Sequence, residues 1–598
     1  MTEASFPRLP PEIRDMILKL LVLPARRLKW GNQLLHSAYA TVCKQWQLFF
    51  ERINFKHIHL LTRYDVFCFG DKVHGRRRWY VEWIWLDVQL PRYDCSRCKT
   101  RESDEEIRRH NRMFTNMFWD LTDILAYWER TEPFINRMKG LTLELSAHSV
   151  DDQCHYYKEL GARMDDTAWG GVGGWYGLLR KSRDNAHMWR EQPASAPRVP
   201  FPNDETNLRV FGPPKGLKFD LLAPAVRKME EKLPRAKIVK GLVIRRQFYR
   251  GFSVSHTLLP IMRVFTRIES FVFEPWRSLE TEHIQPHGQP ILAQAIREAD
   301  YDILFNDLIK YAGNLKRLTI FENHDSRLHR TTHKLLEHPP SPPGGHGFLL
   351  ACSSLYLEEL YASLNVDACQ FFSPFWPGAV LKNAAILAAD LCKWHSLKRL
   401  SLSSQSAITT PGDGLPYDDL IRAAGAAAIK MPLLEIMELW GCDDHTAGVF
   451  QYRRSVRRAA ATTATPLDSG PRTEQARIRL LTTWGAWFSD DAIAAWKKAA
   501  NSHGKELEAV EARTLKPKFF REPSDILGLL DLGDCLMTRT SAQQIMCESL
   551  GVLLPPARGG LGCFGSSYEW ALERVGGGGG DGDGGRDGGE EGNYVLLS

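Results

Sequence analysis

The stretch Leu397-Lys398-Arg399-Leu400-Ser401-Leu402 decides the fold that this sequence predicts. Its apolar side chains stand at the first, fourth and sixth positions, and the same spacing begins at Leu315, Leu357 and Leu434. Alternate side chains of a β-strand point to opposite faces, so the apolar residues at the end of each stretch would point into a core. The middle positions of these four segments lie 42, 40 and 37 residues apart. The spacing predicts a structural repeat with one short strand in each unit.

Weaker copies of the pattern occur at residues 138–143, 239–244 and 268–273. Helical patterns precede three of the stronger copies, at residues 301–311, 380–394 and 418–429. A helix followed by a strand at a regular interval is typical of a parallel α/β solenoid. The pattern therefore predicts an irregular, leucine-rich-repeat-like domain over residues 135–445. Ordinary buried strands of an α/β domain are the alternative interpretation.

The first sixty residues carry a second pattern. They contain Leu9-Pro10-Pro11-Glu12-Ile13 and, about thirty residues later, Val42-Cys43-Lys44-Gln45-Trp46. Proline and an acidic residue favour the first turn of a helix, and apolar residues then recur at helical spacing from Ile13 to Leu21. A further apolar stripe runs from Tyr39 to Phe50. By periodicity alone, the two helices would be an ordinary pair that bury each other.

These two motifs together resemble the F-box, in the form found in fungal F-box proteins with degenerate leucine-rich repeats. The resemblance implies a helical module that docks onto the Skp adaptor of a cullin–RING ubiquitin ligase. The residues that it implies for the adaptor contact are Leu9, Pro10, Ile13, Ile17, Val42, Cys43 and Trp46. Residues 25–34 depart from the family, because they are basic where the family has a short acidic loop and helix.

The remaining segments complete a predicted architecture of mixed α+β and α/β class. Glycine and proline clusters within residues 151–235 indicate a long surface insertion, and Trp484, Trp487 and Trp496 stand near helical spacing. The glycine-rich end of the chain has too few apolar residues to bury a core. The predicted parts are an F-box (1–62), a connecting region (63–134), the repeat domain (135–445), a linker (446–475), a helical C-terminal cap (476–550) and a disordered tail (551–598).

Composition excludes several classes of protein. A chain of 598 residues suggests two to four domains, and a net charge of +6 gives no case for nucleic-acid binding. No run of about 18 uninterrupted apolar residues predicts a membrane span, and no secretory signal is visible. The 12 cysteines follow no disulfide framework, so we expect reduced thiols and a cytoplasmic or nuclear location.

The motifs that could carry chemistry are incomplete. Cys95-Ser96-Arg97-Cys98 has the spacing of half a zinc site, but a structural zinc ion needs four ligands and no second pair exists. The glycines at 170–174 lack the lysine of a phosphate loop, and no hydrolase, protease or kinase motif appears. We therefore expect no metal, no cofactor and no catalytic residue.

The resemblance implies a substrate-recognition adaptor, in which the repeat domain holds a target protein close to the ligase. The target-binding residues expected at the outer positions of the repeats are Lys316, Arg317, Glu358, Glu359, Tyr361, Lys398 and Arg399. One alternative is an F-box scaffold that acts outside the ligase. Another is an enzyme with an unfamiliar site within residues 63–235.

Overall fold

The computed structural model describes residues 6, 9–25, 38–94, 96–97, 100–131, 140–152, 209, 216–220, 235–246, 250–277, 291–322, 345–378, 392–404, 416–442, 446–454, 475–515, 526–539 and 541–542. These residues all belong to one compact unit, Met1–Leu554. The second unit, Pro555–Ser598, contains all but the first four residues of the predicted tail (551–598), and the whole tail lies outside the described residues.

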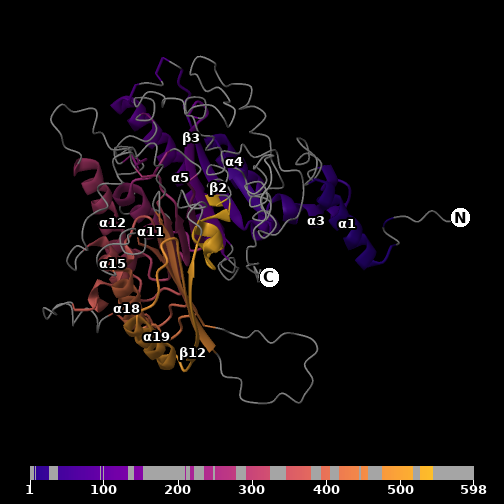
Figure 1. Cartoon of the computed structure of the whole chain (residues 1–598). Helices are drawn as coiled ribbons and strands as arrows, with labels where there is room; N and C mark the ends of the chain where they lie inside the picture. Colours follow the sequence, from indigo (N-terminus) through magenta and orange to yellow (C-terminus); the bar gives the residue numbers. More distant parts are fainter. Residues whose placement is uncertain are drawn as a thin grey trace, which may run out of the picture. The chain divides into compact units, whose positions relative to one another are not determined.

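Twelve strands of the described part form one sheet, and they lie in it in the order in which they follow one another along the chain (Figure 1). Neighbouring strands are parallel, except that β10 is antiparallel to both β9 and β11. The strands are β1 (His57–Leu60), β2 (Trp83–Leu90), β3 (Leu141–Ser149), β4 (Val239–Ile244), β5 (Ser270–Phe273), β6 (Arg317–Phe321), β7 (Glu359–Ser363), β8 (Arg399–Ser403), β9 (Ile436–Cys442), β10 (Ala447–Arg454), β11 (Gln475–Thr482) and β12 (Glu506–Thr514).

The α-helices from α4 to α19 lie between strands in the chain and pack on one face of the sheet, whereas α1 and α3 precede β1 and lie apart from that face (Figure 1). The α-helices are α1 (Pro11–Ala25), α3 (Lys44–Asn54), α4 (Arg63–Lys72), α5 (Asp104–Thr131), α11 (Leu259–Val264), α12 (Ile291–Tyr311), α14 (His346–Ser353), α15 (Ala368–Phe371), α18 (Pro416–Ala428) and α19 (Asp490–Ser502). Shorter helical turns are η2 (Gly75–Tyr80), η5 (Val254–Leu258), η6 (Ser373–Phe375), η8 (Leu527–Leu529) and η9 (Gly533–Cys535). The main core joins alternate strand residues, such as Leu360 and Leu400, to helix residues such as Leu304.

Local sequence signals fix where several of these helices begin. Thr62 and Asp65 form a reciprocal capping box at the start of α4, and this box satisfies backbone N–H groups that the first turn would leave unpaired. The Ser489 side chain accepts from the backbone of Ala492 at the start of α19. These two caps fix where α4 begins after β1 and where α19 begins after β11.

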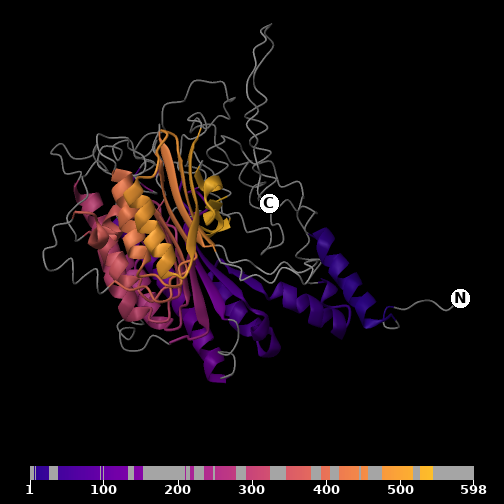
Figure 2. The same ribbon diagram turned by 60° about the horizontal axis from the view of Figure 1, so that its bottom comes forward.

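The second face of the sheet has a cover of its own. Residues 526–539 and 541–542, here called the C-terminal strap, pack Ile526, Leu532 and Leu536 over side chains of this face, such as Trp440. Figure 2 shows the strap (yellow) and the helices α18 and α19 (orange) on opposite sides of the strands. The sheet is therefore a middle layer between the helices and the strap.

The predicted fold class was wrong in its architecture, although the α/β class agrees with the structure. The resemblance implied a separate helical F-box, but α3 leads directly into β1, and β1 pairs with β2 as part of the sheet. The solenoid prediction is replaced, in the described part, by a single mostly parallel sheet with an antiparallel section at β9–β11. The apolar spacing indicates only that alternate residues of each strand face a core. A solenoid and a mostly parallel sheet both have this property.

The helical C-terminal cap was also wrong. Residues 475–482 and 506–514 are the strands β11 and β12, and only α19 between them is helical. All seven segments expected to contain strands do contain them, as β3 to β9. Of the predicted insertion, the described Leu217 and Phe219 are buried in the main core. The predicted linker (446–475) was also wrong in part, because residues 447–454 form β10. Residues 455–474, most of the insertion and the Cys95–Cys98 pair lie outside the described residues.

Candidate functional site

Several apolar side chains of helix α1 are exposed to solvent. Leu18 is 2% exposed, whereas Ile13, Met16 and Leu20 are 42%, 57% and 57% exposed. These three are spaced by three and four residues, which places them on one face of the helix. An apolar face left open to solvent is a mark of a protein–protein contact.

The segment before α3 adds to this apolar surface. Val42 is 59% exposed, and the neighbouring Cys43 is exposed as well. Trp46 is half-buried and lies edge-on to Phe6 and Tyr39, with ring centroids 5.5 and 5.7 Å away. Arg14 Nη1 donates to Gln45 Oε1 at 2.9 Å and links α1 to α3. We call the exposed residues Ile13, Met16, Leu20 and Val42 the N-terminal apolar surface.

The residues that the sequence implied for the adaptor contact divide into two groups in the structure. Pro10, Ile13, Val42 and Cys43 are exposed, whereas Leu9, Ile17 and Trp46 are half-buried. Met16 and Leu20 were not among the implied contacts. They could have been found from the sequence, because they follow Ile13 at helical spacing.

A buried carboxylate holds α3 against the rest of the unit. Glu51 is 3% exposed and pairs with Arg76 at 2.9 Å and with Arg77 at 2.8 Å, both from η2. Burial acts to raise the pKa of Glu51, but the hydrogen bonds from Arg77 and Arg76 win and hold it below 4.5. This clamp positions the helix that follows Val42.

Replacing Glu51 with Gln should loosen α3. Hydrogen bonds to a charged group contribute about 1.5–3 kcal/mol, and the partial exposure of Arg76 and Arg77 reduces the expected loss in free energy of unfolding to about 1–2 kcal/mol. Because the folded-state pKa is lowered, the clamp stabilises the chain above pH 4.5 and is lost as the pH falls further. Thermal unfolding from pH 7 to pH 3 measures this loss.

Asp15→Asn is the control, because Asp15 forms an exposed pair with Lys19 within α1. Its effect should stay within about 0.5 kcal/mol. Equal stability of Glu51→Gln and the wild type at pH 7 would contradict the clamp.

The charged residues expected to bind a target lie where the strands begin, and there they pair with one another. Lys398 Nζ lies 2.9 Å from Glu358 Oε2, and Arg399 Nη1 lies 3.7 Å from Glu359 Oε1. Lys316 pairs in the same way with Glu269 at 3.8 Å. Such partly exposed pairs contribute about 0–1 kcal/mol each, so they define a charged edge more than they stabilise the fold.

Two of the expected target residues differ sharply in exposure. Arg317 is exposed at the start of β6. Tyr361 is 2% exposed, donates to Glu359 at 3.0 Å, and packs in the apolar cluster that the strap covers. Tyr361 is thus closed to a partner while the strap is in place.

Polar side chains of β2 and β3 form a buried network on the second face. Asp87 Oδ1 lies 2.8 Å from His148 Nδ1 and accepts from Ser146 at 2.7 Å, while Asp87 Oδ2 lies 3.2 Å from His59 Nε2. Burial opposes the charge on Asp87, but His148 lowers its pKa far below the usual range. Burial also opposes the charge on His148. The negative charge of Asp87 outweighs this effect of burial and raises the pKa of His148 above 6.5. The two groups therefore form a buried ion pair.

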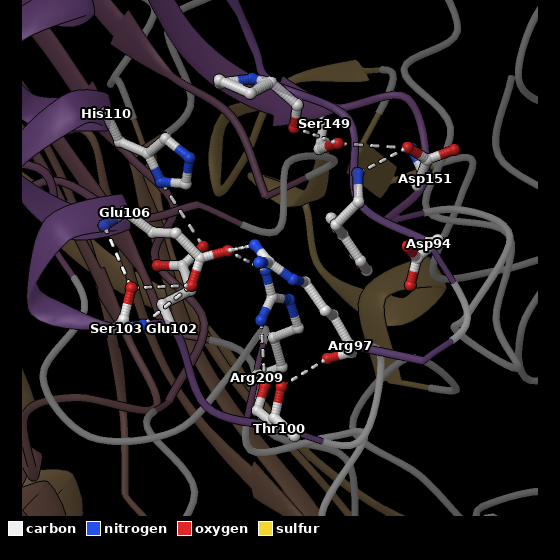
Figure 3. A network of polar contacts seen from close by, with 12 residues as sticks. Asp94, Arg97, Thr100, Glu102, Ser103, Glu106, His110, Ser149, Asp151 and Arg209 are labelled. Carbon is white, nitrogen blue, oxygen red and sulfur yellow. Dashed lines mark hydrogen bonds and ion pairs between the residues drawn. The ribbon is translucent and has the colours of Figure 1, made fainter.

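A second network lies beyond the carboxyl ends of these strands (Figure 3). Arg209 points between two acceptors there, the Thr100 carbonyl and Glu106 Oε1, each at 3.0 Å. Arg250 donates to Asp152 at 2.9 Å and also pairs with Glu102. Each arginine thus meets at least one carboxylate, and the Thr100 carbonyl accepts a further hydrogen bond from Arg209, so the buried charges are paired.

The networks join segments that are distant in the sequence. Among the described residues, no group of three or more His, Cys, Asp or Glu side chains could hold a metal ion. None of the helices that the structure describes is both long and apolar enough to cross a membrane. The pairing of Arg209 and Arg250 with residues about 100 to 150 positions away left no signal in the sequence, because it depends on how loops and α5 come together in the fold.

Comparison with known proteins bears on the second half of the chain. A protein-family model described as "Family of unknown function (DUF6546)" matches residues 310–537. The match runs from the end of α12 through β12 and into the strap, so it includes both layers that cover the sheet there. Searches of curated proteins and of solved structures each found no match. Over residues 310–537 the chain is thus similar to a family whose function is not known.

Proposed function

We propose that this chain is a substrate-recognition subunit of an SCF-type ubiquitin ligase, which binds a Skp-type adaptor through its N-terminal apolar surface. The observation that carries the proposal is the exposure of Ile13, Met16, Leu20 and Val42 beside the two motifs of the adaptor-binding family. Helices α1 and α3 replace the separate bundle that the family uses. The proposal therefore concerns the contact surface and not a bundle fold.

The chemistry of the surface suits a helix-in-groove contact. Apolar side chains at helical spacing insert into a groove of the partner, and a few such anchors supply most of the affinity. The Glu51 clamp and the ring cluster around Trp46 hold α3 in place before binding. The conformational entropy that the chain loses on binding is therefore smaller. The basic side chains Arg52 and Lys56 at the end of α3 suit an acidic rim on the partner.

The target would be held by the sheet domain. The charged edge formed by Lys316, Arg317, Glu358, Glu359, Lys398 and Arg399 would contribute specificity and steering of the target. The ligase then acts by proximity, because the bound target is kept near a ubiquitin-loaded enzyme. The proposal places the chain in the cytosol or the nucleus, which suits the free cysteines of the described part.

Replacing Ile13 and Val42 with Asp should abolish capture of the adaptor. Two charges placed in an apolar contact remove the anchors and leave unpaired carboxylates, so we expect at least about a 100-fold loss of affinity. Affinity capture from cell extract, with quantification of bound adaptor and cullin, measures the effect. The fold should be intact, because both side chains are exposed.

The matched control is Tyr356→Asp with Leu433→Asp, at two other exposed apolar positions. This variant should capture as much adaptor as the wild type. Adaptor binding without ubiquitin transfer to any captured protein in a reconstituted ligase would favour a scaffold outside the ligase. Equal capture by Ile13→Asp/Val42→Asp and wild type would contradict the proposed contact.

A further inference from the structure

The C-terminal strap occupies the second face of the sheet in the way a bound peptide would. Its described residues contain two short turns, η8 and η9, and no strand, so it adds nothing to the sheet's hydrogen-bond ladder. The buried apolar side chains of the strap are Ile526, Leu527, Leu530, Leu532, Leu536, Met537 and Ala542. They pack on a patch contributed by β6, β7, β9, β10 and β11 together with Leu364, and this patch contains Phe321, Tyr361, Leu364, Trp440, Cys442, Ala447, Val449 and Leu481.

Two carboxylates of the second face hold the strap by its backbone. Glu438 in β9 accepts from the backbone N–H of Asp531 at 2.6 Å and of Leu532 at 3.2 Å. Glu274, just after β5, accepts from the backbone N–H of Thr538 and from the Ser541 hydroxyl. Gln451 in β10 adds a hydrogen bond to the Leu529 carbonyl at 3.1 Å.

These contacts form a pattern that a different peptide could reproduce. Every residue except proline has a backbone N–H group. Glu438 and Glu274 can therefore bind a peptide whose backbone follows the same path, whatever its side chains at those positions. Specificity comes from the apolar side chains at Leu532, Leu536 and Met537, which fill fixed positions on the patch. The main core on the opposite face consists of other side chains, those that alternate with the patch residues along each strand.

We infer that the second face of β6–β11 is a peptide-binding surface, occupied in this chain by its own strap, and that a target segment displaces the strap. The inference deepens the proposed function and rests on it, because it names the class of target. That class is an irregular peptide with leucine or methionine side chains at the strap's spacing and with free backbone N–H groups opposite Glu438 and Glu274. An acidic side chain opposite Glu438 would need a cation beside it, as Asp531 of the strap has in Arg453 at 3.2 Å.

The strap must open without unfolding of the sheet if the inference is correct. Hydrogen exchange of the wild-type full chain tests this. The amides of Leu532 and Thr538, bound to the two carboxylates, should exchange at least about 10-fold faster than those of Leu360 and Leu400 in the sheet. Equal rates in both places would mean that the strap opens only in global unfolding, and this outcome would overturn the inference.

A peptide added in trans tests the surface itself. The probe is a fluorescent synthetic peptide with the sequence of residues 524–543. In the wild type, the strap is tethered and has an effective concentration near the millimolar range, so micromolar peptide should bind weakly. The full-chain variant Leu532→Asp/Leu536→Asp/Met537→Asp should release its own strap and bind the wild-type peptide at least about 10-fold more tightly than the wild-type chain does.

Two controls define the result. The chain variant Tyr356→Asp/Leu433→Asp/Trp487→Asp changes three exposed residues outside the strap and should bind the peptide as weakly as the wild type. A peptide with the Leu536→Asp and Met537→Asp changes should not bind the released chain. A folded strap variant that takes up no peptide would overturn the inference, and if that variant does not fold, the exchange rates of the wild type decide.

Adaptor capture is measured on the same variants, so that the two proposals can fail separately. If the released chain captures the adaptor but takes no peptide, the peptide-binding surface is wrong and the proposed function stands. If it takes the peptide but never captures the adaptor, the surface stands and the proposed function fails.

Discussion

Replacing Asp87 with Asn is expected to lower the free energy of unfolding by about 3–5 kcal/mol, because it breaks a buried ion pair on one side. Asp87 is 2% exposed and His148 is 4% exposed, so water cannot compensate for the lost charge. Ser146, which donates to Asp87, also receives a hydrogen bond from the indole of Trp85 at 2.7 Å. Chemical denaturation at pH 6 measures the loss.

The same substitution should change how stability depends on pH. Asp87 raises the pKa of His148 above 6.5 in the folded chain, so this pair stabilises fully below pH 6.5 and is lost as the pH rises through the folded value. The wild type should therefore lose stability as the pH rises above 6.5. Asp87→Asn should not show this loss, because burial alone disfavours the charged imidazole.

The control is Glu82→Gln, which changes a half-exposed partner of Lys56 next to β2. Its effect should stay within about 0.5 kcal/mol at every pH. A destabilisation by Asp87→Asn no larger than that of the control would show that the His148 pair adds nothing to the fold.

Replacing Trp496 with Ala should cost about 3–5 kcal/mol, the range for a large aromatic side chain removed from a core. Trp496 in α19 is fully buried, and its indole N–H donates to the Ile421 carbonyl at 3.0 Å. Its ring packs on Phe450 and Tyr452 of β10, with centroids 5.0 and 4.7 Å away. The substitution would leave a cavity between α19 and the sheet, and it would leave one backbone carbonyl without its donor.

Trp487→Ala is the matched control for this change. Trp487 is 62% exposed, and its backbone carbonyl, which the substitution keeps, accepts a hydrogen bond from the Tyr417 hydroxyl at 3.1 Å. Its removal should change the free energy of unfolding by less than about 0.5 kcal/mol. Equal effects of the two tryptophan substitutions would contradict the packing of α19 on the sheet.

The central strands could be predicted because their apolar residues alternate within short segments. In Leu397 to Leu402 the pattern names the inward side chains, and Leu400 and Leu402 do lie in the main core. The same pattern could not distinguish a solenoid from a mostly parallel sheet, because both bury alternate residues. The two folds differ in how the strands pair and in what covers the second face of the sheet. Neither property can be predicted from the sequence of a single strand segment.

The strands β11 and β12 were not predicted, because Trp484, Trp487 and Trp496 stand near helical spacing and predicted a helical segment there. In the edge strand β12, Glu506 and Glu508 alternate with Leu507 and Ala509, and residues 506–511 alternate between exposed and partly buried positions. Period-two alternation of this kind indicates a strand, so this element could have been predicted. The strap could not, since its leucines follow no regular period and its packing partners lie far away in the sequence.

The candidate docking residues could be predicted in part. The motifs named Ile13 and Val42 as contacts, and both side chains are exposed, but which face of α1 is open depends on where Leu18 packs. The pairing of Asp87 with His148 was beyond prediction, because it needs the parallel register that places β2 next to β3. Local patterns thus determine the elements, and the register determines the buried charges.

Hydrogen exchange of the purified chain, with and without a saturating concentration of purified Skp-type adaptor, tests the docking claim most directly. The account predicts that the adaptor slows exchange at least about 10-fold in α1 and α3 while β7 and β8 are unchanged, and that Ile13→Asp/Val42→Asp abolishes the protection. Unchanged exchange in α1 and α3, or protection that survives this double substitution, would contradict the account.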